Sequence, residues 1–177
     1  MDEVEIRTLG PDDWELLREI RLRALREAPY AFQSRYDDWV EAPEARWRDR
    51  LVNVPLNLVA RRGDELVGMA SGVLDGEDGA ELISMWVDPA ARGSGVGAAL
   101  VGAVVAWAAA AGRPTYLMVR SDNARAIAAY VRAGFVDLGI PPGQSPDEPP
   151  ENRMVHRPSR SSIGHKPQGM RSHTCGS

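Results

Sequence analysis

The chain has 177 residues and a formal net charge of −4, and 44% of its residues are hydrophobic. This length suffices for one domain with a sizeable core, and the acidic balance argues against nucleic acid as a partner. No apolar run reaches the roughly 18 residues of a membrane span, so no membrane partner is expected. The acidic N-terminus has no apolar targeting segment, and the one cysteine, Cys175, is close to the end. These features predict a soluble protein in a reducing cytoplasm.

The first third of the sequence predicts a strand followed by helices. Residues 3–9 alternate between polar and apolar, which is typical of a strand. Pro11 and the two aspartates after it favour a helix start, and Pro29 ends that helix. Residues 30–51 then predict a loop and a second, shorter helix.

The middle of the sequence predicts an antiparallel meander of three strands, at residues 56–62, 65–75 and 80–87. Gly63-Asp64 separates the first two strands and is a hairpin signal, and a glycine-rich turn separates the second from the third. A glycine-rich loop follows, and then the pattern changes.

Beyond this loop the sequence predicts alternating helices and strands. A helix over about 95–111 and a strand at 115–119 make a strand–helix–strand unit, which favours a parallel pair. A helix within 121–135 follows, with Ser121 or Asp122 as the expected cap, and then a strand at 135–140. A short last strand is expected at 154–157.

The glycine-rich loop, "VDPAARGSGVGAAL" at 87–100, allows two interpretations. Gly93, Gly95 and Ala98 match a dinucleotide fingerprint, which would make the protein an NADP-binding oxidoreductase. However, five residues separate the strand from the glycines, a meander precedes them, and no second nucleotide-binding half fits in the chain. The other interpretation is an R-x-x-G-x-G loop formed by Arg92, Gly95 and Gly97.

The second loop pattern has a companion, "NARAIAAYVRAGF" at 123–135. At this spacing the two motifs resemble the acetyl-CoA loop and the N-x-x-A-x-x-x-Y-x-x-x-G-F signature of the GNAT acetyltransferase superfamily. The resemblance covers roughly residues 3–157. It implies a mixed α/β fold with a mostly antiparallel, twisted sheet, flanking helices and a splayed parallel strand pair at the acetyl-CoA site. We expect a single GNAT domain over residues 1–157 and a disordered tail over 158–177, which is polar and unpatterned.

Helix geometry explains why such a loop binds a diphosphate. The first amides of a helix have no internal partners, and the helix dipole is positive there. Glycines let the phosphates approach the backbone, and an arginine adds a charged donor. A turn that only packs the helix on the sheet is the alternative. The expected diphosphate contacts are Arg92, Gly93, Ser94, Gly95, Val96, Gly97 and Ala98.

The resemblance also implies where the rest of the cofactor would lie. Pantetheine would lie between the splayed strands and pair with the backbone of Met85, Trp86 and Val87. Strict alternation would place Met85 and Val87 on the same sheet face as Glu81. Asn123 is expected to hydrogen-bond pantetheine. Tyr130, two helical turns away on the same face, is expected to protonate the departing thiolate, unless it is only a core aromatic.

The acceptor side is less strongly indicated. Glu81, eleven residues before Arg92, is the expected general base, and a solvated or ion-paired strand residue is the alternative. Ser84 is a weaker candidate, as a holder of a water molecule. Phe32 and Tyr36 are candidate substrate-binding residues, although they also suit packing of the second helix on the sheet. The short last strand departs from the family pattern on this side.

These expectations together predict an acetyl-CoA-dependent N-acetyltransferase that works by direct attack in a ternary complex. The acceptor would be a small-molecule or peptide amine, and homodimers are frequent in the family. No metal is expected, because His156, His165 and His173 form no credible ligand set. A non-catalytic CoA-binding regulatory module is the alternative, and the NADP-binding oxidoreductase is a weaker one.

Overall fold

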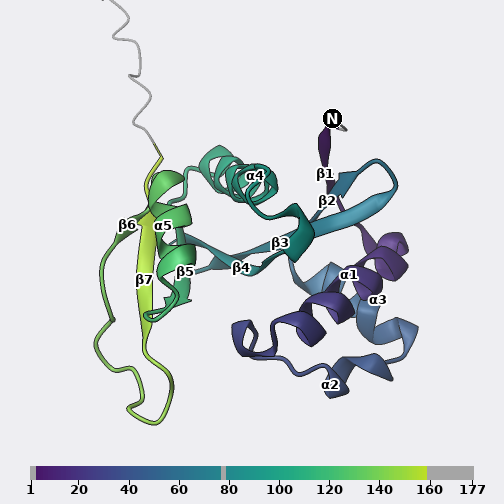
Figure 1. Ribbon diagram of the computed structural model, residues 1–177, viewed down its shortest axis with the longest axis horizontal. Helices are drawn as coiled ribbons and strands as arrows, with labels where there is room; N and C mark the ends of the chain where they lie inside the picture. Colours follow the sequence, from purple (N-terminus) through teal and green to yellow (C-terminus); the bar gives the residue numbers. More distant parts are fainter. Residues whose placement is uncertain (1–2, 77–78, 159–177) are drawn as a thin grey trace, which may run out of the picture.

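A computed structural model describes residues 3–76 and 79–158 of the chain (Figure 1). One seven-stranded sheet has the order β1-β2-β3-β4-β5-β7-β6, and β4–β5 is its parallel pair. The other neighbouring strands run antiparallel. The predicted mixed, mostly antiparallel α/β fold is confirmed. All but the first residue of the expected tail lies outside the described residues.

The sheet accounts for most of the predicted strands within one or two residues. The strands are β1 (Val4–Thr8), β2 (Leu56–Arg62), β3 (Glu65–Asp75), β4 (Gly79–Val87), β5 (Thr115–Arg120), β6 (Val136–Asp137) and β7 (Glu151–His156). The last strand begins three residues earlier than predicted and pairs with the whole of β5. The predicted strand at 135–140 is reduced to two residues.

The helices cover both faces of the sheet. They are α1 (Trp14–Glu27), α2 (Asp37–Val40), α3 (Glu44–Asn53), α4 (Val96–Ala110) and α5 (Ala124–Arg132), with short 3-10 turns at Pro11–Asp13, Pro29–Ala31 and Pro89–Ala91. The single helix predicted between 30 and 51 is therefore two helices. Asn123, not Ser121 or Asp122, caps α5, because its side-chain oxygen accepts from the Ala126 amide at 3.1 Å. No helix in the described residues is both long and apolar enough to span a bilayer.

Alternation along the strands creates two cores. Leu58 and Ala60 pack with α4 on one face, whereas Val59 between them packs with α1 and α3 on the other. Figure 1 shows α4 on one side of the sheet and the N-terminal helices on the opposite side. Ile20 of α1 and Trp47 of α3 are fully buried in the second core. We call the sheet face covered by α1 and α3 the N-terminal face.

Strands β4 and β5 separate soon after they begin. They pair only at Ala80 with Thr115 and at Glu81 with Tyr116. Beyond that point β5 continues to pair with β7, and β4 continues to pair with β3. The edge of β4 that faces β5 is therefore open from residue 82 onward, which is the splayed pair that the resemblance implied.

A β-bulge interrupts β4 at the same place. Ser71 and Met69 of β3 face Ile83 and Trp86 of β4, so β4 contains one extra residue. Ser84 lies in this bulge and has a φ of 53°, the one positive value among the described non-glycine residues. The extra residue resets the alternation, and the prediction that Met85 and Val87 share a face with Glu81 is wrong. Met85 and Val87 pack toward the α4 core instead.

Candidate active site

A groove of about 630 Å³ opens where β4 ends and α4 begins. The C-terminal half of β4, the glycine-rich loop, α5 and the segment after α1 form its walls. Ten of the predicted site residues line it: Met85, Trp86, Val87, Arg92, Gly93, Gly95, Gly97, Ala98, Asn123 and Tyr130. These residues come from three separate stretches of the chain, and the fold brings them together.

The glycine loop presents a helix N-terminus to this groove. Gly93 and Gly95 have φ values of 78° and 90°, which favour glycine, and a Cβ atom on either would meet open space. The first helical hydrogen bond of α4 runs from the Ala99 amide to the Gly95 carbonyl at 3.0 Å. The amides of residues 96–98 consequently have no helical partner. This arrangement suits an anion bound at the N-terminus of α4.

Ser94 and Val96 do not line the groove with their side chains. The Val96 side chain, in the first turn of α4, is fully buried, and the Ser94 hydroxyl donates to the Ala91 carbonyl at 2.6 Å. The Ser94 hydroxyl also accepts from Arg62. Any contact of these two residues with a ligand would therefore use their backbone.

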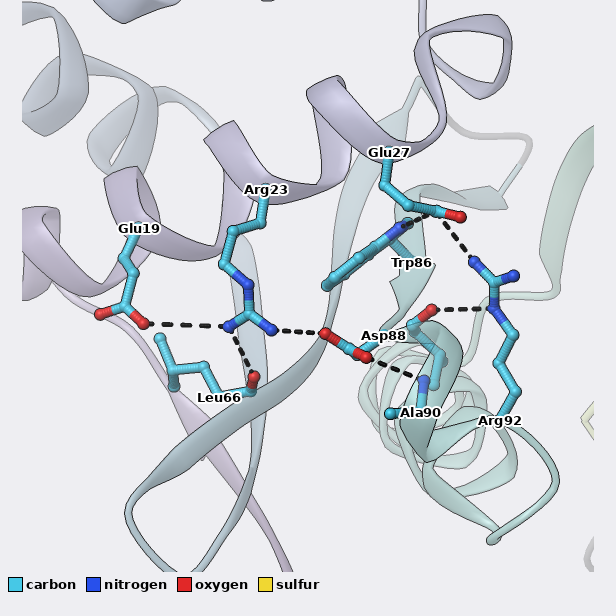
Figure 2. Close-up of polar contacts among 9 residues, drawn as sticks. Glu19, Arg23, Glu27, Leu66, Trp86, Asp88, Ala90 and Arg92 are labelled. Atoms are coloured by element: carbon cyan, nitrogen blue, oxygen red, sulfur yellow. Dashed lines mark hydrogen bonds and ion pairs between the residues drawn. The ribbon is translucent and has the colours of Figure 1, made fainter.

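Glu27, at the end of α1, links the loop to β4 (Figure 2). One of its carboxylate oxygens accepts from the Trp86 indole nitrogen and from the Arg92 guanidinium, both at 2.9 Å. The Arg92 Nε also donates to the Val87 carbonyl at 3.1 Å. The guanidinium that sequence analysis assigned to a diphosphate is thus already oriented by the protein. Glu27 had no recognisable signal in the sequence, because it lies 65 residues from Arg92.

A second connection from α1 reaches the same loop. Arg23 donates to the Leu66 carbonyl at 2.9 Å and pairs with the Asp88 carboxylate (Figure 2). The other oxygen of Asp88 accepts from the Ala90 amide at 2.9 Å. Helix α1 therefore fixes the start of the glycine-rich loop at two points.

Helix α5 contributes Asn123 and Tyr130 from one side of the groove. Asn123 uses its side-chain oxygen as the helix cap, and its side-chain nitrogen donates to no described residue. The Tyr130 ring packs against Phe135 with ring centroids 5.8 Å apart, and its hydroxyl bonds to no described residue. Burial raises the pKa of Tyr130 to about 12. At neutral pH the Tyr130 hydroxyl is therefore protonated.

Glu81 lies outside the groove, where β4 and β5 are still paired. It faces the N-terminal face of the sheet, because the neighbouring Leu82 packs toward α4. Burial and the negative charge of Asp75 raise the pKa of Glu81. Tyr116, opposite Glu81, donates to Asp75 at 2.6 Å, and the Arg153 guanidinium lies 4.4 Å from the Tyr116 ring centre. A carboxyl group with a raised pKa suits a general base.

Phe32 and Tyr36 do not line the groove. Both are partly buried against the core of the N-terminal face. The Tyr36 hydroxyl accepts from Arg26 at 2.5 Å, and the same guanidinium lies 4.8 Å from the Tyr36 ring centre. These contacts are those of the packing alternative, and a role in substrate binding stays a prediction.

Ser84 contacts two arginines that sequence analysis did not identify. Its hydroxyl accepts from Arg21 of α1 at 3.3 Å and from Arg50 of α3 at 2.9 Å. The two arginines are 29 positions apart in the sequence and lie on different helices. Periodicity alone gave no signal that they meet.

The family model of the Acetyltransferase (GNAT) family matches residues 14–135, which include both the glycine loop and the α5 motif. The chain belongs to the GNAT acetyltransferase family. It is 31% identical over 156 residues to a mycothiol acetyltransferase of Mycolicibacterium paratuberculosis, a match that covers 77% of this chain and 48% of that protein. The chain thus spans about half the length of this curated relative.

Solved structures of GNAT proteins share the fold. An acetyltransferase of the GNAT family from Streptococcus pneumoniae has a TM-score of 0.70 at 21% identity, covering 86% of this chain and 97% of that one. The PaiA N-acetyltransferase from Thermoplasma acidophilum, solved in complex with coenzyme A, has a TM-score of 0.66 at 19% identity, covering 88% and 99%. The GNAT family uses acetyl-CoA. Neither the fold nor these comparisons support the NADP-binding alternative.

Proposed function

We propose that the protein is an N-acetyltransferase that moves an acetyl group from acetyl-CoA to a small-molecule or peptide amine. The observation that carries this proposal is that one groove contains both an open helix N-terminus and an open strand edge. The first suits a diphosphate, and the second suits a chain of amides. A CoA thioester contains both groups, because its pantetheine carries the amides and joins the diphosphate at one end to the thioester at the other.

The cofactor would be bound mainly by backbone groups. The amides of residues 96–98 face the diphosphate, with Gly93 and Gly95 providing space for it and Arg92 adding positive charge. The β4 edge at residues 85–87 pairs with pantetheine, and the free nitrogen of Asn123 donates to it from α5. This arrangement would aim the thioester toward the bulge at Ser84.

At the acetyl carbon the reaction forms one bond and breaks one, and two proton transfers accompany them. Acetyl-CoA supplies an activated thioester; the amine nitrogen bonds to the acetyl carbon, and the carbon–sulfur bond breaks. Glu81 accepts the proton that the amine loses, directly or through water, and the Tyr130 hydroxyl donates a proton to the departing thiolate. No acyl-enzyme is needed, because the amine attacks the thioester directly. The rate would come mainly from positioning and from polarisation of the carbonyl.

An acetylation screen tests this proposal. The full chain is incubated with acetyl-CoA and a panel of amines that includes amino acids, polyamines, aminoglycosides and peptides. Mass spectrometry then looks for products about 42 Da heavier, because an acetyl group has replaced a hydrogen atom. Acetylation of at least one amine class is the expected result. Tight CoA binding without any turnover would favour the regulatory-module alternative, and a thermal shift with NADPH but not with CoA would contradict the proposal.

Two further expectations accompany this function. A cytoplasmic location stays a prediction from the sequence, which fractionation of the source cells would check. A homodimer also stays a prediction, which light scattering on the purified full chain would check.

A further inference from the structure

Two arginines converge on the bulge of β4 without an acidic partner in the described part of the chain. Arg21 is only 3% exposed and Arg50 is half-buried, and both donate to the Ser84 hydroxyl. Arg21 also donates to the Ser34 hydroxyl at 3.1 Å, and its guanidinium lies 5.0 Å from the Trp39 ring centre. All these partners are neutral.

The charge of this pair is not balanced by the described part of the chain. No carboxylate there lies within ion-pair distance of either guanidinium. The Nε atoms of Arg21 and Arg50 are both buried and have no hydrogen-bond partner within residues 3–76 and 79–158. Burial and the charge of Arg50 lower the pKa of Arg21 to about 9, and burial lowers the pKa of Arg50. Two close, uncompensated cations are unfavourable unless an anion joins them.

The position of the pair connects it to the proposed reaction. Ser84 precedes Met85, the first residue of β4 that lines the groove. It lies in the bulge with a positive φ, so the chain maintains an uncommon conformation where both arginines meet. The pair also lies on the N-terminal face, which Glu81 shares. An anion at Ser84 would therefore lie beside the thioester and on the face of the proposed base.

We propose that the acceptor amine carries a carboxylate, which Arg21 and Arg50 bind at Ser84. This inference rests on the proposed acetyl transfer and names the acceptor class for it. The planar guanidinium fork matches a carboxylate, and the buried Nε–H of each arginine has no partner among the described residues. A singly charged, planar group also suits this enclosed position better than a strongly hydrated phosphate dianion.

Matched acceptors test the proposal through a selectivity ratio. For each amino acid that the protein acetylates, kcat/KM is compared with those of its carboxamide, of the amine without the carboxyl group, and of the aminophosphonate. The wild type is expected to favour the carboxylate at least about tenfold over each analogue, because each analogue leaves the cations uncompensated or binds them poorly. Equal or higher kcat/KM for the carboxamide or the phosphonate would overturn the carboxylate assignment.

Variants of Arg50 separate recognition from a structural role. Arg50→Met is expected to lower the carboxylate-to-carboxamide ratio to about one, and Arg50→Lys to an intermediate value, because lysine keeps the charge and loses the fork. Arg48→Met, on the same helix but paired with Glu44 and Asp12, is the control and leaves the ratio unchanged. Removing an uncompensated guanidinium should not lower Tm. A lowered Tm with an unchanged ratio in both Arg50 variants would show a structural role and overturn the proposal.

A binding measurement decides the inference even without turnover. In ¹⁵N-labelled full-length protein saturated with CoA, the arginine Nε–H signals are followed as pools of the free amino acids, and then of their carboxamides, are added. The proposal predicts that the Arg21 and Arg50 signals move with the carboxylate pool only. If no amine is acetylated, the proposed function fails separately; if these signals do not move, or move equally with both pools, this inference fails.

Discussion

Tyr130 is protonated over the whole working pH range, since burial raises its pKa to about 12. As the proposed acid, it keeps its proton until the thiolate departs. Tyr130→Phe keeps the ring that packs against Phe135 and removes the donor. We expect kcat to fall by about 100-fold with little change in CoA affinity. Stopped-flow turnover and calorimetry on the same preparation check this, and an unchanged kcat would remove the acid role.

Glu81 has the opposite requirement, because a base must be ionised. Its pKa is raised by burial and by Asp75, so kcat/KM should fall as pH decreases through that raised value. In Glu81→Gln the amine must lose its proton before it binds, and the profile should move toward higher pH. A kcat/KM profile between about pH 5 and 10 checks this. If both proteins have the same profile, Glu81 is not the base.

The N-terminus of α4 depends on Gly95 for its geometry. A side chain at a φ of 90° is strained by about 1–2 kcal/mol, and it would project into the space proposed for the diphosphate. Gly95→Asp adds like charge and should abolish CoA binding in calorimetry. Gly102→Ala is the matched control: it lies in the same helix with space around it, and should stabilise the protein by about 0.5–1 kcal/mol without affecting CoA. Retained affinity for CoA in Gly95→Asp would contradict diphosphate binding at the N-terminus of α4.

Helix α1 fixes the glycine loop through Glu27. Glu27→Ala leaves the Trp86 indole N–H, on a side chain only 5% exposed, without its acceptor, and removes the partner of Arg92. We expect the free energy of unfolding to fall by about 1–3 kcal/mol and CoA binding to weaken. Glu19→Ala, on the same helix with a long 3.9 Å contact to Arg23, should change stability by less than about 0.5 kcal/mol. Denaturant titration of both variants tests this. Equal losses in the free energy of unfolding would refute the role of Glu27 in holding the glycine loop.

At the scale of the whole molecule, the sequence predicted features that local chemistry determines. The Gly63-Asp64 turn and the R-x-x-G-x-G loop have local signals, and most strands and helices lie within a few residues of their predicted bounds. The bulge at Ser84 has no such signal, because no glycine or proline marks it. It reversed the predicted face of Met85 and Val87.

Contacts between distant elements were the part that the sequence did not predict. Glu27 meets Arg92 because the end of α1 lies beside the glycine loop, and Arg21 and Arg50 meet at Ser84 because α1 and α3 cover the same sheet face. Glu27, Arg21 and Arg50 are ordinary charged residues on amphipathic helices, where a solvated position is the usual expectation. Their partners depend on the order of strands in the sheet, which pattern analysis does not determine.

The central claim is that free amides at the start of α4 bind a diphosphate and thereby direct the acetyl group along the open edge of β4. A crystal structure of the full chain with acetyl-CoA tests it most directly. The account predicts phosphate oxygens within hydrogen-bond distance of the amides of residues 96–98, and pantetheine beside residues 85–87. A cofactor bound elsewhere, or those amides bonded to other parts of the protein, would contradict it.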